Sequence, residues 1–264
     1  MTDADRQRLR ATFTEDAELY ARRRSGYPAA TMHDLAALGA LRPGSRVLEI
    51  GCGAGQATLP LARLGCKITA VELGPELAAV ARDRLAGFDN TEVVVANFED
   101  WPLPRPGFDL VLAATSFHWI DPAIRMKKSA DALRPNGALA VISTHHVAGG
   151  TRTFFVDVQA CYECFDPTTP PGLRLQRPED IPADIVEFEE SGRFGPVTVR
   201  RYQWEMAYTA GEYLELLSTY SGHRAMTAQS RKGLFACIKR LIDDHGGTIV
   251  KRYMTQLAIA HRLR

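Results

Sequence analysis

Short apolar runs recur along the first half of the chain, and segments of helical length separate them. Runs without regular polar alternation are typical of strands buried on both faces of a parallel sheet. The predicted strands cover residues 46–50, 66–72, 91–96, 108–112 and 138–144. Helices are expected at 3–24, 29–41, 57–64, 75 to about 86, and from 122 to just before 133. The alternation of strands with helices predicts an α/β fold.

Local signals refine these boundaries. Pro60 lacks an N–H and clashes with a preceding helical turn, so the helix at 57–64 is expected to start late or to kink. Asp121 and Pro122 form a strong helix start. The Leu133-Arg-Pro-Asn-Gly137 segment predicts a turn before the fifth strand.

The second half of the chain has a less regular pattern. Residues 145–192 predict helices and loops over a binding pocket. Thr209 and Glu212 have the spacing of a capping box, which predicts a helix through Tyr220. Further predicted elements are a strand at 197–204, a helix at about 227–244 and a last strand at 256–263.

The first apolar run ends in three alternating glycines, Gly51, Gly53 and Gly55. A strand, a glycine turn and a helix in this order expose backbone N–H groups to a ligand, and glycine lets that ligand approach closely. A dinucleotide fingerprint would need glycine at position 56, where Gln56 stands. Glu49, within the strand, would repel a diphosphate and attract an ammonium group.

This stretch resembles motif I of the class I S-adenosylmethionine (SAM) dependent methyltransferases, and the whole chain is most similar to their small-molecule, methyltransferase type 11-like branch. Glu72 follows Gly51 by 21 residues, where a carboxylate can accept from both hydroxyls of a ribose. Three further segments resemble the family and follow in its order: F-D at 108–109, Ser116 to Trp119 in the place of the family's S-x-x-H-W turn, and L-R-P-x-G at 133–137. The resemblance is firm over residues 44–144.

The N-terminal phrase from Tyr20 to Pro28 is similar to a Y-x-x-x-R-P-x-Y-P segment that closes over the cofactor in many small-molecule methyltransferases. The resemblance implies that Arg24 faces the SAM carboxylate and that Tyr20 and Tyr27 help to close the pocket. Ser25 stands where the family has proline. The three consecutive arginines ending at Arg24 are also compatible with a solvated helix face.

The resemblance implies a Rossmann-like, doubly wound, seven-stranded and mostly parallel sheet with an antiparallel last strand and a helical lid. We expect three segments: 1–42 closing over the cofactor, 43–144 as the SAM-binding core, and 145–264 as lid and last strands. The implied cofactor site consists of Tyr20, Arg24, Tyr27, Glu49, Gly51, Cys52, Gly53, Gly55, Gln56, Glu72, Leu73, Asn97, Phe98, Ala114 and Phe117.

Within this site Asn97 replaces the family's adenine-binding aspartate, and its amide oxygen can still accept a hydrogen bond. Phe98 suits either an adenine face or the core. Trp119 and His145 are expected to contact the substrate. His118 is the candidate general base and His146 the weaker candidate, because imidazole titrates near neutral pH. The alternative for His118 is a bond within its loop or a contact with SAM.

Composition limits the partners. The 264 residues carry a formal charge of +1, so no general field attracts nucleic acid or anionic lipid. The charged N-terminus is unlike a signal peptide, and no apolar stretch has the length of a membrane span.

Five cysteines predict reduced thiols and a cytoplasmic location. Cys161 and Cys164 have the spacing of a zinc half-site without a second pair, so we expect core packing and no metal.

The implied function is methyl transfer from SAM to a small-molecule acceptor, with O-methylation of a metabolite or natural product as the leading form. Two alternatives stay open: an NAD-dependent oxidoreductase on the same fold, and a SAM-dependent methyltransferase acting on protein or RNA. The near-zero net charge and the long C-terminal lid favour the small acceptor. The sequence leaves open whether the protein is a monomer or a homodimer.

Overall fold

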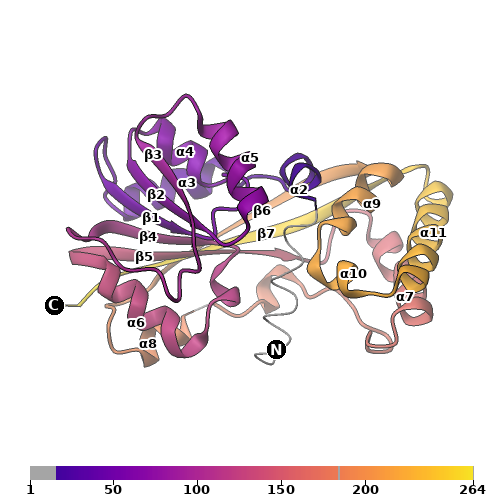
Figure 1. Ribbon diagram of the computed structural model, residues 1–264. Coiled ribbons are helices and arrows are strands. Elements are labelled where there is room, and N and C mark those ends of the chain that lie inside the picture. The colour runs from indigo at the N-terminus through magenta and orange to yellow at the C-terminus, as the bar shows by residue number, and fades with distance from the viewer. Residues whose placement is uncertain (1–15, 184, 264) are drawn as a thin grey trace. The chain divides into compact units, whose positions relative to one another are not determined.

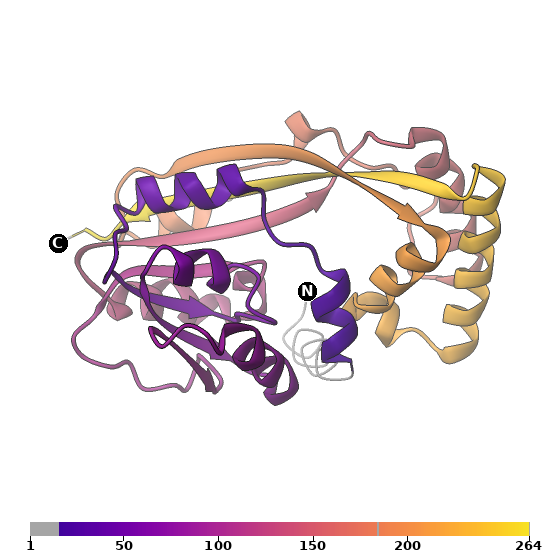
Figure 2. The ribbon, with the colours of Figure 1, turned by 90° about the horizontal axis from the view of Figure 1, so that it is seen from above.

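The computed structural model describes residues 16–183 and 185–263, and these residues form a seven-stranded sheet with the order β3-β2-β1-β4-β5-β7-β6 (Figure 1). The strands are β1 (Arg46–Ile50), β2 (Lys67–Glu72), β3 (Thr91–Val95), β4 (Phe108–Ala114), β5 (Leu133–His146), β6 (Thr198–Thr209) and β7 (Thr248–His261). Strands β1 to β5 pair in parallel, and β7 runs opposite to β5 and β6 (Figure 2). The predicted fold class is confirmed.

The chain divides into two compact units. The first, here called the sheet unit, comprises residues 25–144, 183–202 and 255–264. The second, the helical unit, comprises, of the residues described, 16–24, 145–182 and 203–254. The division of the chain into segments 1–42, 43–144 and 145–264 stays a prediction. No helix in the described part of the chain is long and apolar enough to cross a membrane.

Helices cover both faces of the sheet unit because successive strand residues point to opposite sides. Val47 belongs to one buried hydrophobic cluster and its neighbour Leu48 to the other. The first cluster packs against α3 (Ala29–Leu38), α4 (Thr58–Arg63) and α5 (Pro75–Leu85); the second packs against α6 (Pro122–Ala132) and α8 (Val186–Glu190) (Figure 1). This packing fixes the strand ends that carry the candidate site.

Two local predictions need correction. Helix α4 begins at Thr58, so Pro60 falls in the first turn, where its missing N–H removes no helical hydrogen bond. The segment 133–137 is part of β5 and not a separate turn before it. It forms an irregularity in which Phe108 pairs with Leu133 but Leu110 pairs with Ala138. A left-handed Asn136, with φ 64°, accommodates the extra residues.

The helical unit contains α2 (Ala17–Arg23), α7 (Arg152–Phe165), the short η3 (Pro178–Asp180), α9 (Ala210–Ser218), α10 (Ser221–Ala225) and α11 (Ala228–Asp244). The predicted helix at 3–24 is described only from α2 onward, and residues 3–15 lie outside the described residues. Thr209 and Glu212 form the predicted capping box of α9, with both reciprocal hydrogen bonds present. Buried aromatic and aliphatic side chains from α7, α9 and α11 make up a third hydrophobic cluster.

The expectation of reduced thiols is wrong for two of the five cysteines. Cys161 of α7 and Cys237 of α11 form a disulfide inside the helical unit. Cys52 and Cys66 are buried free thiols, and Cys164 is an exposed one. An odd count does not exclude one pair, and the spacing of 76 residues between the partners gives no local signal. The cysteine argument for a cytoplasmic location is therefore lost, and that location stays a prediction.

Candidate functional site

The glycine loop after β1 depends on backbone conformations that only glycine adopts easily. Gly51, Gly53 and Gly55 have φ values of 69°, 57° and 81°. Gly51 N donates to Val71 O at 2.7 Å, and Gly55 N donates to Cys52 O at 2.9 Å. The loop therefore turns tightly at the carboxyl ends of β1 and β2, the edge of a parallel sheet where ligands bind.

Gly51 also lies against the end of β4. A Cβ atom at Gly51 would be 2.7 Å from Ser116 Cβ, a contact that real side chains do not make. The Ser116 hydroxyl donates to Ile50 O and so ties the β4 end to β1. Thr115 before it has φ 58°, which is a strained conformation for a β-branched residue. Strain of this kind is often found at functional sites.

Glu72 holds the loop in place with both carboxylate oxygens. Oε2 accepts from Gly53 N at 2.8 Å, and Oε1 accepts from Gly74 N at 2.9 Å. The side chain is buried, so these charge-assisted bonds work in a low-dielectric setting. A carboxylate oxygen can accept more than one hydrogen bond, which recognition of a ribose diol would use.

Glu49 is the most perturbed acid of the site. It is 1% exposed, and burial, reinforced by the nearby Glu72 carboxylate, raises its pKa to about 8. Its Oε2 atom has no hydrogen-bond partner among the residues that the structure describes. The same holds for the Nε2 donor of Gln56 at the end of the glycine loop. A buried acceptor and a buried donor beside one loop suit the ammonium and the carboxylate of an amino acid.

The turn after β3 places Asn97 and Phe98 differently. Asn97 Oδ1 accepts from Glu99 N at 3.2 Å, and its amide nitrogen donates to Asp100 at 2.7 Å. The amide oxygen can accept a second bond. Phe98 is buried in the second hydrophobic cluster, with Lys128 Nζ 5.4 Å from its ring centroid. The structure thus gives Phe98 a core environment.

The segment after β4 forms a short 3-10 helix, η2 (Phe117–Trp119). Phe117 is buried, whereas His118 is exposed and its ring lies 4.7 Å from that of Trp119. The Tyr27 hydroxyl reaches the Thr115 hydroxyl at 2.9 Å. Tyr27 and η2 therefore lie at the same strand end as the glycine loop, together with Ala114, the last residue of β4.

Other predicted site residues belong to the helical unit: Tyr20, Arg24, His145 and His146. Arg24 donates to the Thr219 hydroxyl at 2.9 Å and to Thr219 O at 3.0 Å. His146 packs edge-on against Phe155, and burial together with the Lys251 charge lowers its pKa to about 2. An imidazole with so low a pKa is a poor proton acceptor, which argues against His146 as the base.

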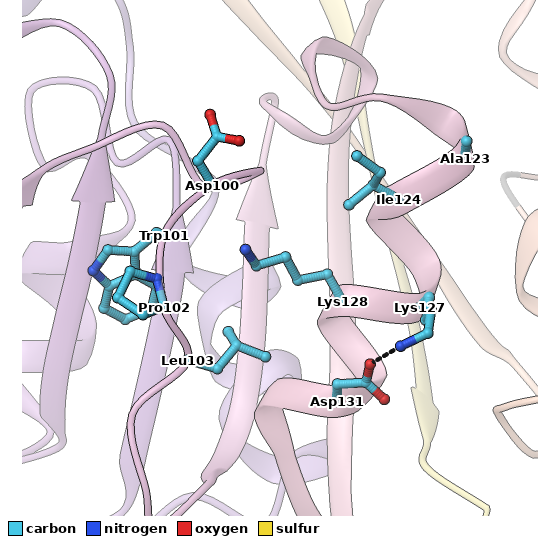
Figure 3. A pocket seen from close by; sticks show the side chains of 9 residues that line it. All are labelled: Asp100, Trp101, Pro102, Leu103, Ala123, Ile124, Lys127, Lys128 and Asp131. Atoms are coloured by element: carbon cyan, nitrogen blue, oxygen red, sulfur yellow. Dashed lines mark hydrogen bonds and ion pairs between the residues drawn. The ribbon is translucent and has the colours of Figure 1, made fainter.

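A pocket of about 490 Å³ lies beside the Asn97 turn, between residues 100–103 and helix α6 (Figure 3). Lys128 extends across it and donates to Glu99 O at 2.8 Å, and Lys127 pairs with Asp131 (Figure 3). None of the predicted site residues lines this pocket. In the described part of the chain no group of three or more histidine, cysteine or acidic side chains is arranged to hold a metal ion.

Comparison with known proteins gives a clear relationship for the core. Residues 48–141 match the family described as a methyltransferase domain. An uncharacterised methyltransferase of Mycobacterium bovis is 32% identical over 137 residues, 52% of this chain and 54% of that protein. A ubiquinone biosynthesis O-methyltransferase of Xanthomonas campestris is 39% identical over 100 residues, 37% of this chain and 42% of that protein. The chain thus spans about half the length of the curated relatives it matches.

Solved structures share the fold at low sequence identity. Phosphoethanolamine N-methyltransferase 2 of Haemonchus contortus, solved with phosphomonomethylethanolamine and S-adenosylhomocysteine, gives a TM-score of 0.56 at 17% identity, over 98% of this chain and 60% of that chain. The YcgJ protein of Bacillus subtilis gives 0.54 at 15% identity, over 90% and 100% of the two chains. Residues 48–141 therefore match a methyltransferase domain, and the chain shares the fold of these solved structures.

One residue of the site was beyond sequence reasoning. Thr115 has no sequence signal for a left-handed conformation, because β-branched residues normally avoid it. Ser116 belongs to a segment that resembles the family, but its close contact with Gly51 was not predicted. A contact between the ends of β1 and β4 becomes predictable only when these two strands are known to be neighbours.

Proposed function

We propose that this chain transfers a methyl group from SAM to a small-molecule acceptor, with an acceptor oxygen as the leading target. The observation that carries the proposal is the buried Oε2 of Glu49, which lies next to the positive-φ glycine loop and has no hydrogen-bond partner in the part of the chain that the structure describes. An ammonium group would stabilise the ionised form of this carboxyl, whereas the diphosphate of NAD would offer it no counter-charge. Gln56 offers a donor to the carboxylate at the same end of the cofactor.

The remaining residues would hold the rest of the cofactor. Glu72 would accept from the ribose hydroxyls while keeping its bonds to the loop. Asn97 would accept from the adenine amino group, and Leu73 and Cys52 would line the pocket. Arg24 would face the carboxylate, and Tyr20 and Tyr27 would close the site. SAM, when bound, supplies a methyl carbon already activated by the sulfonium.

The chain's own contribution to the reaction would be positioning and water exclusion. Correct positioning of two reactants can lower a barrier by up to ~7–11 kcal/mol. Phe117 and Trp119 offer ring faces, which favour a cationic sulfonium. His118 is exposed at the strand end and would remove a proton from an acceptor hydroxyl. The named O-methyltransferase relative supports an oxygen acceptor, and Trp119 and His145 are the proposed substrate contacts.

Calorimetric titration tests this function against its nearest rival. We expect SAM and S-adenosylhomocysteine to bind and NAD to show no saturable heat. A screen of small hydroxylated acceptors, followed by release of S-adenosylhomocysteine, would then identify the substrate class. Tight NAD binding without SAM binding would instead make the protein an oxidoreductase.

Replacement of Glu72 by alanine should weaken SAM binding at least tenfold. The change removes the proposed ribose acceptor and both bonds that hold Gly53 N and Gly74 N, and charge-assisted hydrogen bonds contribute roughly 1.5–3 kcal/mol each. Glu76→Ala is the matched control, because Glu76 is an exposed acid in the first turn of α5. An unchanged SAM dissociation constant in Glu72→Ala would remove Glu72 from the site.

His118→Ala should lower turnover about 100-fold or more with little change in SAM affinity, because general base catalysis contributes roughly 10²–10⁴-fold. His33→Ala serves as control, since His33 is an exposed histidine of α3 in the same unit. Steady-state kinetics and SAM titrations on the same samples separate the two effects. A parallel loss of turnover and SAM affinity would make His118 a binding residue.

A further inference from the structure

The helical unit contains a buried lysine surrounded by tyrosines. Lys251 of β7 is 3% exposed. Its Nζ lies 5.8, 5.2 and 4.9 Å from the ring centroids of Tyr213, Tyr220 and Tyr253. It also forms a hydrogen bond of 3.2 Å with the Tyr220 hydroxyl. Ring faces stabilise an ammonium only partly, and a buried charge is costly unless an anion compensates it.

No carboxylate among the described residues forms an ion pair with Lys251. The acids of the helical unit that form ion pairs do so elsewhere: Glu212 and Glu215 with Arg23, Glu205 with Arg252, Asp157 with His245, Asp243 with Lys239, and Glu179 and Asp180 with Arg177. Asp166, near the same region, accepts hydrogen bonds from Thr168 and Thr169. None of the carboxylates in residues 16–183 and 185–263 therefore pairs with Lys251.

A second cation lies on the same tyrosine. Arg24 Cζ is 4.2 Å from the ring centroid of Tyr220, and its printed hydrogen bonds go to Thr219. Under the proposed function the SAM carboxylate is the counter-ion of Arg24. Tyr220 and Arg24 are only half-buried, so this side of the cluster can be reached from solvent.

The positive charge of Lys251 affects the pKa values of two neighbouring histidines. Burial, and after it the Lys251 charge, lowers the pKa of His146 to about 2 and that of His223 to about 4. Asp166 opposes the effect at His223 without reversing it. The other titratable groups around the cluster are Tyr162 of α7, Tyr208 of β6, Tyr213 of α9 and Tyr253 of β7. None of them is an acid that ionises near neutral pH in this setting.

We propose that Lys251, with the Tyr220 hydroxyl, binds the oxyanion of a small carboxylate or phosphate compound within the helical unit. The anion site rests on the burial of Lys251 and on its contact with Tyr220, and it does not depend on the proposed function. Tyrosine hydroxyls and an ammonium are donors that match a carboxylate or a phosphate. Binding there would restore the missing counter-charge.

The alternative explanation is that the Tyr220 hydroxyl is ionised and is itself the counter-ion of Lys251. Burial raises the pKa of Tyr220, but the charges of Lys251 and Arg24 outweigh this and lower it overall. An ionised Tyr220 would pair with Lys251 and leave no need for an external anion. The two accounts predict opposite results for the removal of the ammonium.

The test uses the whole chain and titrates inorganic phosphate and, separately, acetate at constant ionic strength, with the thermal midpoint of unfolding and calorimetry as readouts. We expect one or both anions to raise the midpoint of the wild type. Lys251→Met should bind the preferred anion at least about tenfold more weakly, since a charge-assisted bond is lost. Lys239→Met, an exposed lysine paired with Asp243, is the matched control and should behave as the wild type.

Stability and spectroscopy complete the test. Without anion, Lys251→Met should unfold at the same temperature as the wild type or higher, because an uncompensated buried charge is gone. Tyr220→Phe should keep part of the anion affinity.

Failure of both anions to bind the wild type while SAM binds normally would overturn the anion site alone. A near-neutral tyrosinate absorbance that disappears in Tyr220→Phe would also overturn it. Loss of SAM binding in the wild type would instead refute the proposed function.

Discussion

Glu49→Gln should make the ligand-free protein more stable at alkaline pH than the wild type. The buried Glu49 has its pKa raised from 4.5 to about 8. A carboxyl whose folded-state pKa is raised favours folding below its unfolded pKa, and this advantage is lost as the pH rises through about 8. The difference between the ordinary pKa of 4.5 and the folded-state pKa of about 8 corresponds to at most about 5 kcal/mol of unfolding free energy. Glutamine cannot ionise and keeps the shape.

Denaturant unfolding at a series of pH values measures this difference. The free energies of unfolding of wild type and Glu49→Gln should agree near pH 4.5 and diverge steadily up to about pH 9. Glu92→Gln, at an exposed position of β3, should follow the wild type throughout. Parallel curves for wild type and Glu49→Gln would show that the carboxyl is compensated inside the folded protein.

The same carboxyl gives the binding reaction a proton signature. Near pH 7 Glu49 is mostly protonated, and an arriving ammonium would require its charged form. SAM binding should therefore release about one proton at pH 7, and markedly less about two pH units higher. Calorimetry in two buffers of different ionisation enthalpy measures this number. The Glu49→Gln variant should bind SAM more weakly and release no such proton.

Gly51→Ala should destabilise the fold and weaken SAM binding together. The left-handed φ of 69° costs a non-glycine residue about 1–2 kcal/mol. The new Cβ would stand 2.7 Å from Ser116 Cβ, and overpacking of this kind costs about 1–3 kcal/mol. The free energy of unfolding should thus fall by about 2–5 kcal/mol. The measurement is chemical denaturation, with SAM affinity on the same samples.

Two variants separate the causes. Gly87→Ala is the matched control, because a Cβ there meets nothing within 4 Å and the backbone is not left-handed. It should change stability little. The double variant Gly51→Ala/Ser116→Gly should regain the unfolding free energy that was lost through the clash with Ser116. It should still lack the unfolding free energy that was lost through the left-handed backbone at position 51. A Gly51→Ala protein as stable as the wild type would mean that the loop is not held as the structure shows.

The sequence was sufficient to predict the core strands and the glycine loop, where the residue pattern determines the backbone conformation. The apolar run before Gly51 predicted β1, and the run from Cys66 to Glu72 predicted β2 with Glu72 at its end. Both depend on local patterns: buried parallel strands are continuously apolar, and glycine loops need left-handed backbone. What the residues bind stays a prediction, but their meeting at one edge is observed.

The rest depended on contacts between distant residues. Strand β7 begins at Thr248, eight residues before its predicted start at Gln256, because pairing with neighbouring strands and not local propensity extends it. The Cys161–Cys237 pair joins two helices that no short-range pattern relates. The counter-ion problem of Lys251 is equally invisible, since a lysine in a strand reads as a solvated residue until its burial is known.

The most direct test of the account is a crystal structure with S-adenosylhomocysteine. The account predicts the amino group of the ligand within hydrogen-bond distance of Glu49 Oε2, its ribose hydroxyls on Glu72, and the loop of Gly51, Gly53 and Gly55 beneath it. A ligand bound elsewhere, with Glu49 Oε2 still lacking an ammonium partner, would contradict the central claim.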